Sequence, residues 1–179
     1  MPPARRRDFL AGRCALRRAL AAAGLPVAEV LREGRRPLLP AGCAGSVSHS
    51  DGLAVAVAGP TSRAHALGCD LELRGLPLEG AHLVLDPGER GRLHAAASPG
   101  AAQRRLLAAF SAKEAAFKAL SVLLPPGQTP SLLLDLTTSQ LSDGFRVWPR
   151  ARPDAVLHVR VHRAGDGVFS WVVAERGPP

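Results

Sequence analysis

The chain of 179 residues has almost no lysine, because only two of its 23 lysine and arginine residues are lysine. Aromatic residues are also scarce, with five phenylalanines, two tryptophans and no tyrosine. The interior must therefore be built mainly from Leu, Val and Ala. The hydrophobic fraction of 46% is sufficient for one domain, or for two small lobes that share a core.

Long apolar runs and cysteine pairs are missing too. No stretch reaches the roughly 18 apolar residues that a membrane-spanning helix requires, so we expect no membrane span. The basic start MPPARRRDFLAGR has no apolar h-region, which argues against a signal peptide and favours a cytoplasmic location. Cys14, Cys43 and Cys69 form no CxxC pair, so we expect neither a zinc site nor a disulfide framework but buried free thiols.

Acidic residues are too few to balance the arginines, and the formal net charge is +8. Such a charge favours an acidic partner, which is nucleic acid, an anionic membrane surface, a phosphorylated small molecule or an acidic protein. A compositional bias toward arginine, with the side chains solvated, is an equally good explanation. Only Phe9 lies near the arginines of the N-terminal region, so they fit a polyphosphate site better than a stacking surface for nucleic acid.

The N-terminal third predicts a helix followed by a β-hairpin. Residues 8–24 have helical spacing, with Asp8 as the expected N-cap. Residues 32–45 are rich in Gly and Pro and indicate a loop. Two extended runs then flank Asp51-Gly52, a dipeptide that favours a tight hairpin turn.

The rest of the chain repeats this order on a larger scale. Residues 65–73 predict a strand, residues 101–124 a helix that ends at Pro125-Pro126, and the C-terminal third a series of strands ending in a hairpin. We therefore predict an α+β fold of two pseudo-symmetric lobes, residues 1–62 and residues 63–179. The first lobe is the shorter one, with no strand before its helix.

Two carboxylates share one side of the first strand in the second lobe. In the run GCDLE, Asp70 and Glu72 are two residues apart and so point to the same face. Carboxylates at that spacing repel each other unless a cation lies between them, and hard oxygen ligands of this kind suit Mg²⁺. An edge strand with its acidic face in water is the simpler alternative.

The run FSAKEAAFK contains both lysines of the chain, and in a helix Glu114 and Lys118 are neighbours at i and i+4. A solvated ion pair worth about 0.3–0.5 kcal/mol is one interpretation. A capping box of Ser111 and Glu114 is another, although a helix that begins near residue 101 weakens it. Because arginine occupies every other basic position, we interpret Lys113 and Lys118 as retained for the chemistry of a compact ammonium.

A third polar group, Ser48-His49, lies just before the hairpin turn. A histidine beside a turn is often only partly exposed and without function, whereas a Ser-His pair at a strand end can bind a phosphate. A catalytic triad of Ser48, His49 and Asp51 is unattractive, because neighbouring residues of an extended chain point in opposite directions.

Together these runs resemble the signature blocks of the 4′-phosphopantetheinyl transferase superfamily, most closely its Sfp-type, EntD-like branch. GCDLE resembles the G-x-D-x-E strand of the family, and FSAKEAAFK resembles its K-E-x-x-K helix. RRPLLPAGCAGSVSH and RRRDFLAGR resemble two upstream blocks of the branch. The four blocks occur in the order of the family and span residues 5–118.

The resemblance implies an Mg²⁺-dependent enzyme that moves the phosphopantetheine arm of coenzyme A onto a serine of an acidic acyl or peptidyl carrier protein, as in siderophore, polyketide or nonribosomal peptide synthesis, and releases 3′,5′-ADP. It implies that Asp70, Glu72 and Glu114 hold the metal, that Glu114 is also the base and that Lys118 serves both catalysis and the diphosphate. It further implies coenzyme A contacts from a larger set of residues: Arg7, Arg13, Arg35, Arg36, Ser48, His49, Lys113 and Lys118. A monomer is expected.

Two other hypotheses compete with an active transferase. A shortened relative would still bind coenzyme A or a carrier protein without turning over, and the short first lobe favours that alternative. A nucleic-acid-binding protein is supported by charge alone, and we expect no nucleic-acid partner.

Overall fold

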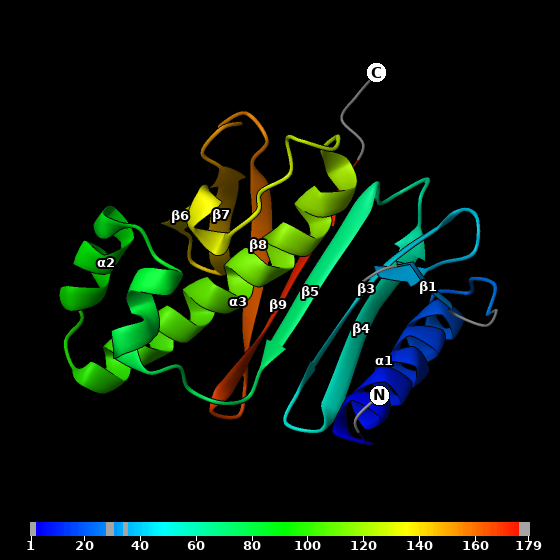
Figure 1. Cartoon of the computed structure of the whole chain (residues 1–179), viewed down its shortest axis with the longest axis horizontal. Coiled ribbons are helices and arrows are strands. Elements are labelled where there is room, and N and C mark those ends of the chain that lie inside the picture. Colours follow the sequence, from blue (N-terminus) through cyan, green and yellow to red (C-terminus); the bar gives the residue numbers. More distant parts are fainter. Residues whose placement is uncertain (1–2, 28–30, 34–35, 176–179) are drawn as a thin grey trace.

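The structure is a computed structural model that describes residues 3–27, 31–33 and 36–175 (Figure 1). The first lobe contains a helix, a two-stranded ribbon and a hairpin: α1 (Pro3–Ala22), β1 (Leu31–Glu33), β2 (Arg36–Leu38), β3 (Cys43–Ser50) and β4 (Leu53–Pro60). Leu16 and Leu20 of α1 are fully buried against Cys43 and so fix the helix on the hairpin. In Figure 1, α1 lies along β4, on the side away from the larger lobe.

Two local predictions for this lobe were wrong. Asp8 is not an N-cap, because α1 already begins at Pro3 and Asp8 lies within it. Residues 32–45 are not a continuous loop, since β1 and β2 pair there and β3 starts at Cys43. Their Gly and Pro content hid the strands, and Pro37 is tolerated because a two-stranded ribbon consists only of edge strands.

The predicted hairpin is confirmed by β3 and β4, which pair in antiparallel register from Cys43–Pro60 to Ser50–Leu53. Asp51 has a φ of 51° and Gly52 a φ of 78°. Tight two-residue turns of the kind that suits twisted strands require positive φ at both central positions, which Asp and Gly tolerate. The turn therefore sets the register of the hairpin.

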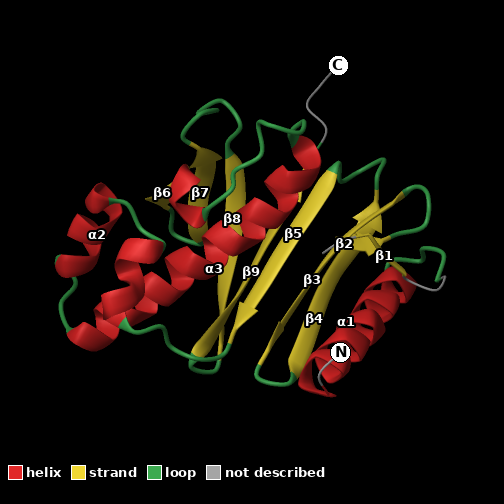
Figure 2. Ribbon diagram, viewed as in Figure 1, coloured by secondary structure: helices red, strands yellow, loops and turns green. Residues whose placement is uncertain are grey.

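The second lobe is one long helix on a five-stranded antiparallel sheet (Figure 2). The strand order is β5-β9-β8-β7-β6, with β5 (Ala66–Glu72), β6 (Leu136–Gln140), β7 (Gly144–Pro149), β8 (Leu157–Ala164) and β9 (Gly167–Ala174). The helix α3 (Pro99–Leu123) crosses one face of the sheet, and α2 (Pro87–His94) with the short 3₁₀ helices η1 (Leu78–Leu83) and η2 (Leu133–Asp135) completes the lobe. The predicted strand at 65–73 and helix at 101–124 are thus confirmed.

The position at which α3 begins tests the interpretation of Ser111 and Glu114 as a capping box. Ser98 caps the helix by accepting a hydrogen bond from the backbone N–H of Ala101, and Pro99 occupies the first turn. Ser111 therefore lies within the helix, where it donates a hydrogen bond to the backbone carbonyl of Asp70 at 3.5 Å. A capping box of Ser111 and Glu114 is excluded.

Alanine and glycine allow α3 to approach β5 very closely. Ala112, Ala115, Ala116 and Ala119 of α3 are completely buried. A Cβ atom on Gly68 would lie 1.9 Å from the carbonyl oxygen of Ala115, so only glycine fits at that position of β5. The glycine of the G-x-D-x-E run therefore sets the separation between the strand and the helix.

Each lobe consists of one long helix packed on an antiparallel sheet, which confirms the α+β class. The core of the larger lobe is mostly Leu, Val and Ala, as the composition predicted. Of the thiols, Cys43 and Cys69 are buried as expected, but Cys14 is exposed on α1. Within the described part of the chain, no helix has the length and apolarity to cross a membrane.

We predict that Gly68→Ala lowers the free energy of unfolding by about 1–3 kcal/mol, because the new methyl group meets a helix carbonyl that cannot rotate away. Urea denaturation followed by circular dichroism measures the change. Gly91→Ala is the matched control: it lies within α2, where a Cβ atom would meet no other atom within 4 Å, and it should be neutral or stabilising. Equal stability of the Gly68→Ala protein and the wild type would contradict the close contact.

Candidate functional site

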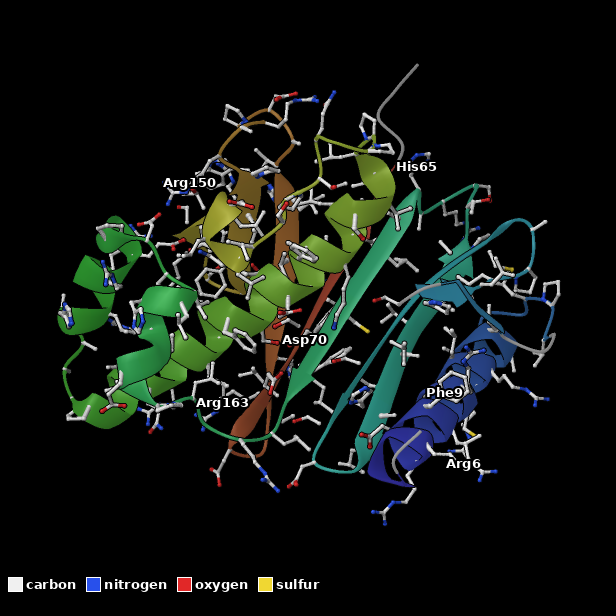
Figure 3. All side chains as sticks on the ribbon, viewed as in Figure 1. Arg6, Phe9, His65, Asp70, Arg150 and Arg163 are labelled. Carbon is white, nitrogen blue, oxygen red and sulfur yellow. The ribbon has the colours of Figure 1, made fainter. Side chains whose placement is uncertain are left out.

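Side chains from three elements meet at the carboxylate of Asp70, in the middle of β5 (Figure 3). Lys118 of α3 donates to Oδ1 of Asp70 at 2.8 Å and to the carbonyl oxygen of Cys69 at 2.9 Å. Ser48 of β3 donates to the same Oδ1 at 3.0 Å, and Lys118 contacts the Ser48 hydroxyl at 3.4 Å. The three residues join both lobes and are called the Asp70 cluster below.

The sequence builds this cluster through two simple periodicities. Asp70 and Glu72 point to the α3 side of the sheet, since alternate residues of a strand share a face. On α3, Glu114 and Lys118 are one turn apart, and Ser111 one turn earlier bonds to the backbone of Asp70. Both signature runs of the sequence therefore meet along one line of contact between α3 and β5.

Two further carboxylates, Glu72 and Glu114, lie near the Asp70 cluster. Burial raises the pKa of Glu72 to about 7, and the nearby carboxylates of Asp70 and Glu114 act in the same direction. Lys118 lowers the pKa of Glu72 but does not cancel these effects. Asp70 is only 3% exposed, and its Oδ2 is buried without a hydrogen-bond partner. An additional cation would satisfy both Oδ2 and the half-buried Glu72.

The predicted metal ligands Asp70, Glu72 and Glu114 are close enough to interact electrostatically, yet they do not form a finished site. Among the residues that the structure describes, no three His, Cys, Asp or Glu side chains are arranged to hold a metal ion. The donor chemistry nevertheless fits Mg²⁺, which prefers carboxylate oxygens and keeps several waters. The unpaired Oδ2 of Asp70 supports the same fit.

A cavity of about 590 Å³ opens between the two lobes beside this cluster. Glu114 and Lys118 lie on its wall, together with Phe117 of the same helix and His65, directly before β5. Residues 43–47 of β3 form the opposite wall. Its volume lies in the range of ligand pockets in proteins, and its wall combines apolar side chains with a carboxylate and an ammonium.

The residues expected to bind phosphates are spread over several places. Ser48 belongs to the Asp70 cluster, whereas His49 is exposed and points to the opposite face of the hairpin. Arg7 is exposed on α1, and the guanidinium of Arg13 lies 4.4 Å from the ring centre of Phe9. Their assignment to coenzyme A phosphates therefore stays a prediction.

The residues expected to bind phosphates are apart because they lie on different faces of the hairpin of β3 and β4. α1 packs on the face that carries Val47, which lies 3.2 Å from a Cβ built on Gly12, whereas Ser48 faces β5. Figure 3 shows Phe9 and Asp70 on opposite sides of the hairpin. Arg35 lies outside the described residues, and of Arg36 only the backbone is described, directly before the cavity residue Pro37.

The position of Lys113 does not agree with the expectation that this residue contacts coenzyme A. Its ammonium is fully buried and donates to Glu89 of α2 at 2.7 Å and to the carbonyl of Val84 at 2.8 Å. Burial lowers the pKa of Lys113, and the partner Glu89 opposes that change. Lys113 therefore has its partners in the interior of the second lobe and not in the cleft.

The structure also identifies three residues that the sequence interpretation missed. Ser46 accepts a hydrogen bond from the backbone N–H of Cys69 at 3.0 Å, and Ser50 accepts one from Leu73 at 3.1 Å. The signal available in the sequence was the alternation of serines in SVSHS, which places them on one face of the predicted strand. The pairing of Glu89 gave no such signal, because its partners Lys113 and Thr138 are distant in the sequence.

Comparisons with known proteins match the parts of the chain that contain the signature runs. Residues 66–162 match the 4′-phosphopantetheinyl transferase superfamily, and residues 1–59 match the N-terminal domain of 4′-phosphopantetheinyl transferases. Enterobactin synthase component D of Salmonella typhimurium is 34% identical over 142 residues, which are 77% of this chain and 58% of that protein.

Two further relatives are named as transferases. The 4′-phosphopantetheinyl transferase Npt of Nocardia iowensis is 38% identical over 64% of this chain and 51% of its own length. The 4′-phosphopantetheinyl transferase Svp of Streptomyces mobaraensis is 40% identical over 65% of this chain and 48% of its own. The chain thus spans between 48% and 58% of the length of these relatives.

A match over more than half of the chain, in the region that holds both signature runs, is sufficient to identify the family. The chain belongs to the 4′-phosphopantetheinyl transferase superfamily. Its relatives place it with the Sfp-type, EntD-like branch.

We predict that Lys113→Met destabilises the fold by about 3–5 kcal/mol, because Glu89 is left as an uncompensated buried charge. Chemical denaturation measures the loss. The double variant Lys113→Met, Glu89→Leu should be less destabilised than the sum of the two single variants, since no unpaired charge remains. Strict additivity of the two changes would contradict the buried pair.

A second prediction concerns pH. Glu72 has a pKa of about 7 in the folded chain and an ordinary value of 4.5, so between these values the folded state binds more protons than the unfolded state. The contribution of Glu72 to stability therefore falls as pH rises from about 5 to about 7. Without divalent metal, Glu72→Gln should gain stability relative to the wild type at pH 8 compared with pH 5, as measured by urea denaturation.

The exposed Glu79 of η1 provides the control, since Glu79→Gln should show the wild-type profile. Parallel profiles for the wild type and Glu72→Gln across this range would contradict the raised pKa.

Proposed function

We propose that the chain is a 4′-phosphopantetheinyl transferase that moves the phosphopantetheine arm of coenzyme A onto a serine of an acyl or peptidyl carrier protein. The observation that carries the proposal is the meeting of Asp70 and Glu72 with Glu114 and Lys118 beside an interlobe cavity. These four residues occupy the signature positions of the family, and the relatives are named for this transfer.

The cavity would hold coenzyme A with its diphosphate toward the ammonium of Lys118. Lys118 already lies on the cavity wall and is partly exposed, with 29% of its side chain accessible, so it can contact an anion there. The net charge of +8 would steer both acidic substrates toward the protein. Arg7, Arg13, Arg35, Arg36 and His49 are proposed to bind the remaining phosphate groups.

Glu114 is proposed as the general base. The serine hydroxyl of the carrier attacks the phosphorus that bears the pantetheine arm, the phosphoanhydride bond breaks, and 3′,5′-ADP leaves. Glu114 accepts the proton of that hydroxyl, directly or through a water. Phosphoryl transfer of this kind depends mainly on positioning and charge stabilisation, so no covalent intermediate on the protein is needed.

Asp70, Glu72 and Glu114 would hold Mg²⁺, which when bound neutralises charge on the diphosphate. The unpaired, buried Oδ2 of Asp70 supports this assignment. The raised pKa of Glu72 supports it too, since burial and the neighbouring carboxylates disfavour its charged form, which a cation would stabilise. The proposal also includes a cytoplasmic, monomeric protein and an acidic carrier.

A relative that binds coenzyme A without turnover is the second candidate. The specific observation in its favour is that Asp70, Glu72 and Glu114, although near one another, are not arranged to hold a metal ion within the described part of the chain. Binding of coenzyme A measured by calorimetry, without product in a mass assay, would favour this candidate over the transferase.

Intact-mass spectrometry of an apo carrier protein, incubated with the chain, coenzyme A and Mg²⁺, tests the transfer directly. We expect the carrier to gain the mass of one phosphopantetheine, and Glu114→Gln to slow that gain by about 100-fold or more because the base is lost. Glu175→Gln, at an exposed position directly after β9, is the control and should retain the wild-type rate. A Glu114→Gln protein with undiminished rate would rule out Glu114 as the base.

A further inference from the structure

The contact between β3 and β5 is made by serine side chains. Ser46 bonds to the backbone of Cys69 and Ser50 to that of Leu73, so both bonds connect residues 23 positions apart. The two strands therefore run side by side in the same direction, joined through hydroxyl groups along this seam (Figure 1).

Ser48, the middle serine, uses its hydroxyl differently from its two neighbours. A separation of 23 would lead from Ser48 to Leu71, but the hydroxyl of Ser48 donates to Oδ1 of Asp70 at 3.0 Å. Ser48 is only 7% exposed, and it also accepts a contact from Lys118 at 3.4 Å. A hydroxyl has one donor hydrogen, so the hydrogen of Ser48 is committed to the carboxylate.

The two oxygens of Asp70 consequently have different surroundings. Oδ1 receives Ser48 from the first lobe and Lys118 from the second. Oδ2 is buried and has no hydrogen-bond partner. Two donors on one oxygen prevent the carboxylate from exchanging its oxygens at random, and so Oδ2 is the oxygen left for a cation.

We propose that Ser48 is a positioning residue for the metal site: its hydroxyl fixes Oδ1 of Asp70 and thereby presents Oδ2 to the divalent ion. The inference rests on the proposed function, because it presupposes that Asp70 is a metal ligand. It reassigns Ser48 from phosphate binding to the support of a carboxylate, and it makes β3 of the first lobe a part of the metal site. Residues that orient metal ligands commonly contribute about 10–100-fold to metal affinity.

Titrations of the full chain with Mg²⁺ and with coenzyme A distinguish a role of Ser48 in positioning Asp70 from a role in binding a phosphate group. Isothermal titration calorimetry with Mg²⁺, in the presence of coenzyme A, should show about 10-fold weaker metal binding for Ser48→Ala than for the wild type. Coenzyme A binding in EDTA should change by less than about twofold, because in this role Ser48 makes no phosphate contact. Ser48→Thr keeps the hydroxyl and should restore metal binding to within about threefold of the wild type.

Ser50→Ala is the matched control, since it removes a hydroxyl from the same seam that bonds only to backbone. It should lower thermal stability as much as Ser48→Ala does, yet leave Mg²⁺ affinity unchanged. This comparison separates positioning from a general weakening of the seam.

The opposite result overturns the inference. If Ser48→Ala binds coenzyme A more weakly in EDTA but binds Mg²⁺ as the wild type does, Ser48 binds a phosphate group and does not position Asp70. A wild type that binds Mg²⁺ with the same affinity as Ser48→Ala would overturn the inference and leave the proposed function standing. A wild type that binds no Mg²⁺ would overturn both the inference and the metal part of the proposed function.

Discussion

The close contact between α3 and β5 is the constraint on which the site depends. Gly68 admits the backbone of Ala115, and the small residues of α3 allow the helix to lie flat on the strand. Glu114 and Lys118 therefore reach the same volume as Asp70 and Glu72, although more than forty residues separate Asp70 from Glu114 in the sequence. The carboxylates are brought together by backbone packing, and burial, followed by the repulsion from neighbouring carboxylates, raises the pKa of Glu72.

The two lysines of the chain illustrate two uses of one side chain. Lys118 pairs with Asp70 at the edge of the cavity, where its side chain is 29% exposed. Lys113, on another side of α3, is enclosed with Glu89 and connects α3 to α2. Both positions require a compact ammonium on a flexible stem, which explains why arginine has not replaced either residue.

The sequence was sufficient for the hairpin at Asp51-Gly52, the strand at 65–73 and the helix at 101–124, because each has a strong local signal. Spacing paired Asp70 with Glu72 and Glu114 with Lys118, and only the family resemblance implied that the two pairs act together. The sequence did not predict β1 and β2, whose pairing overrides a loop-like composition. Nor did it predict the partner of Lys113 or the bond of Ser48, because both depend on contacts between distant segments.

The serine seam has a consequence for association between molecules. β5 is the outermost strand of its sheet, and an exposed outer strand invites a strand from another chain to add to the sheet. Ser46 and Ser50 occupy the outward N–H groups of Cys69 and Leu73 with side-chain oxygens. The hairpin thus shields this border of the sheet, beside Asp70, against intermolecular strand addition.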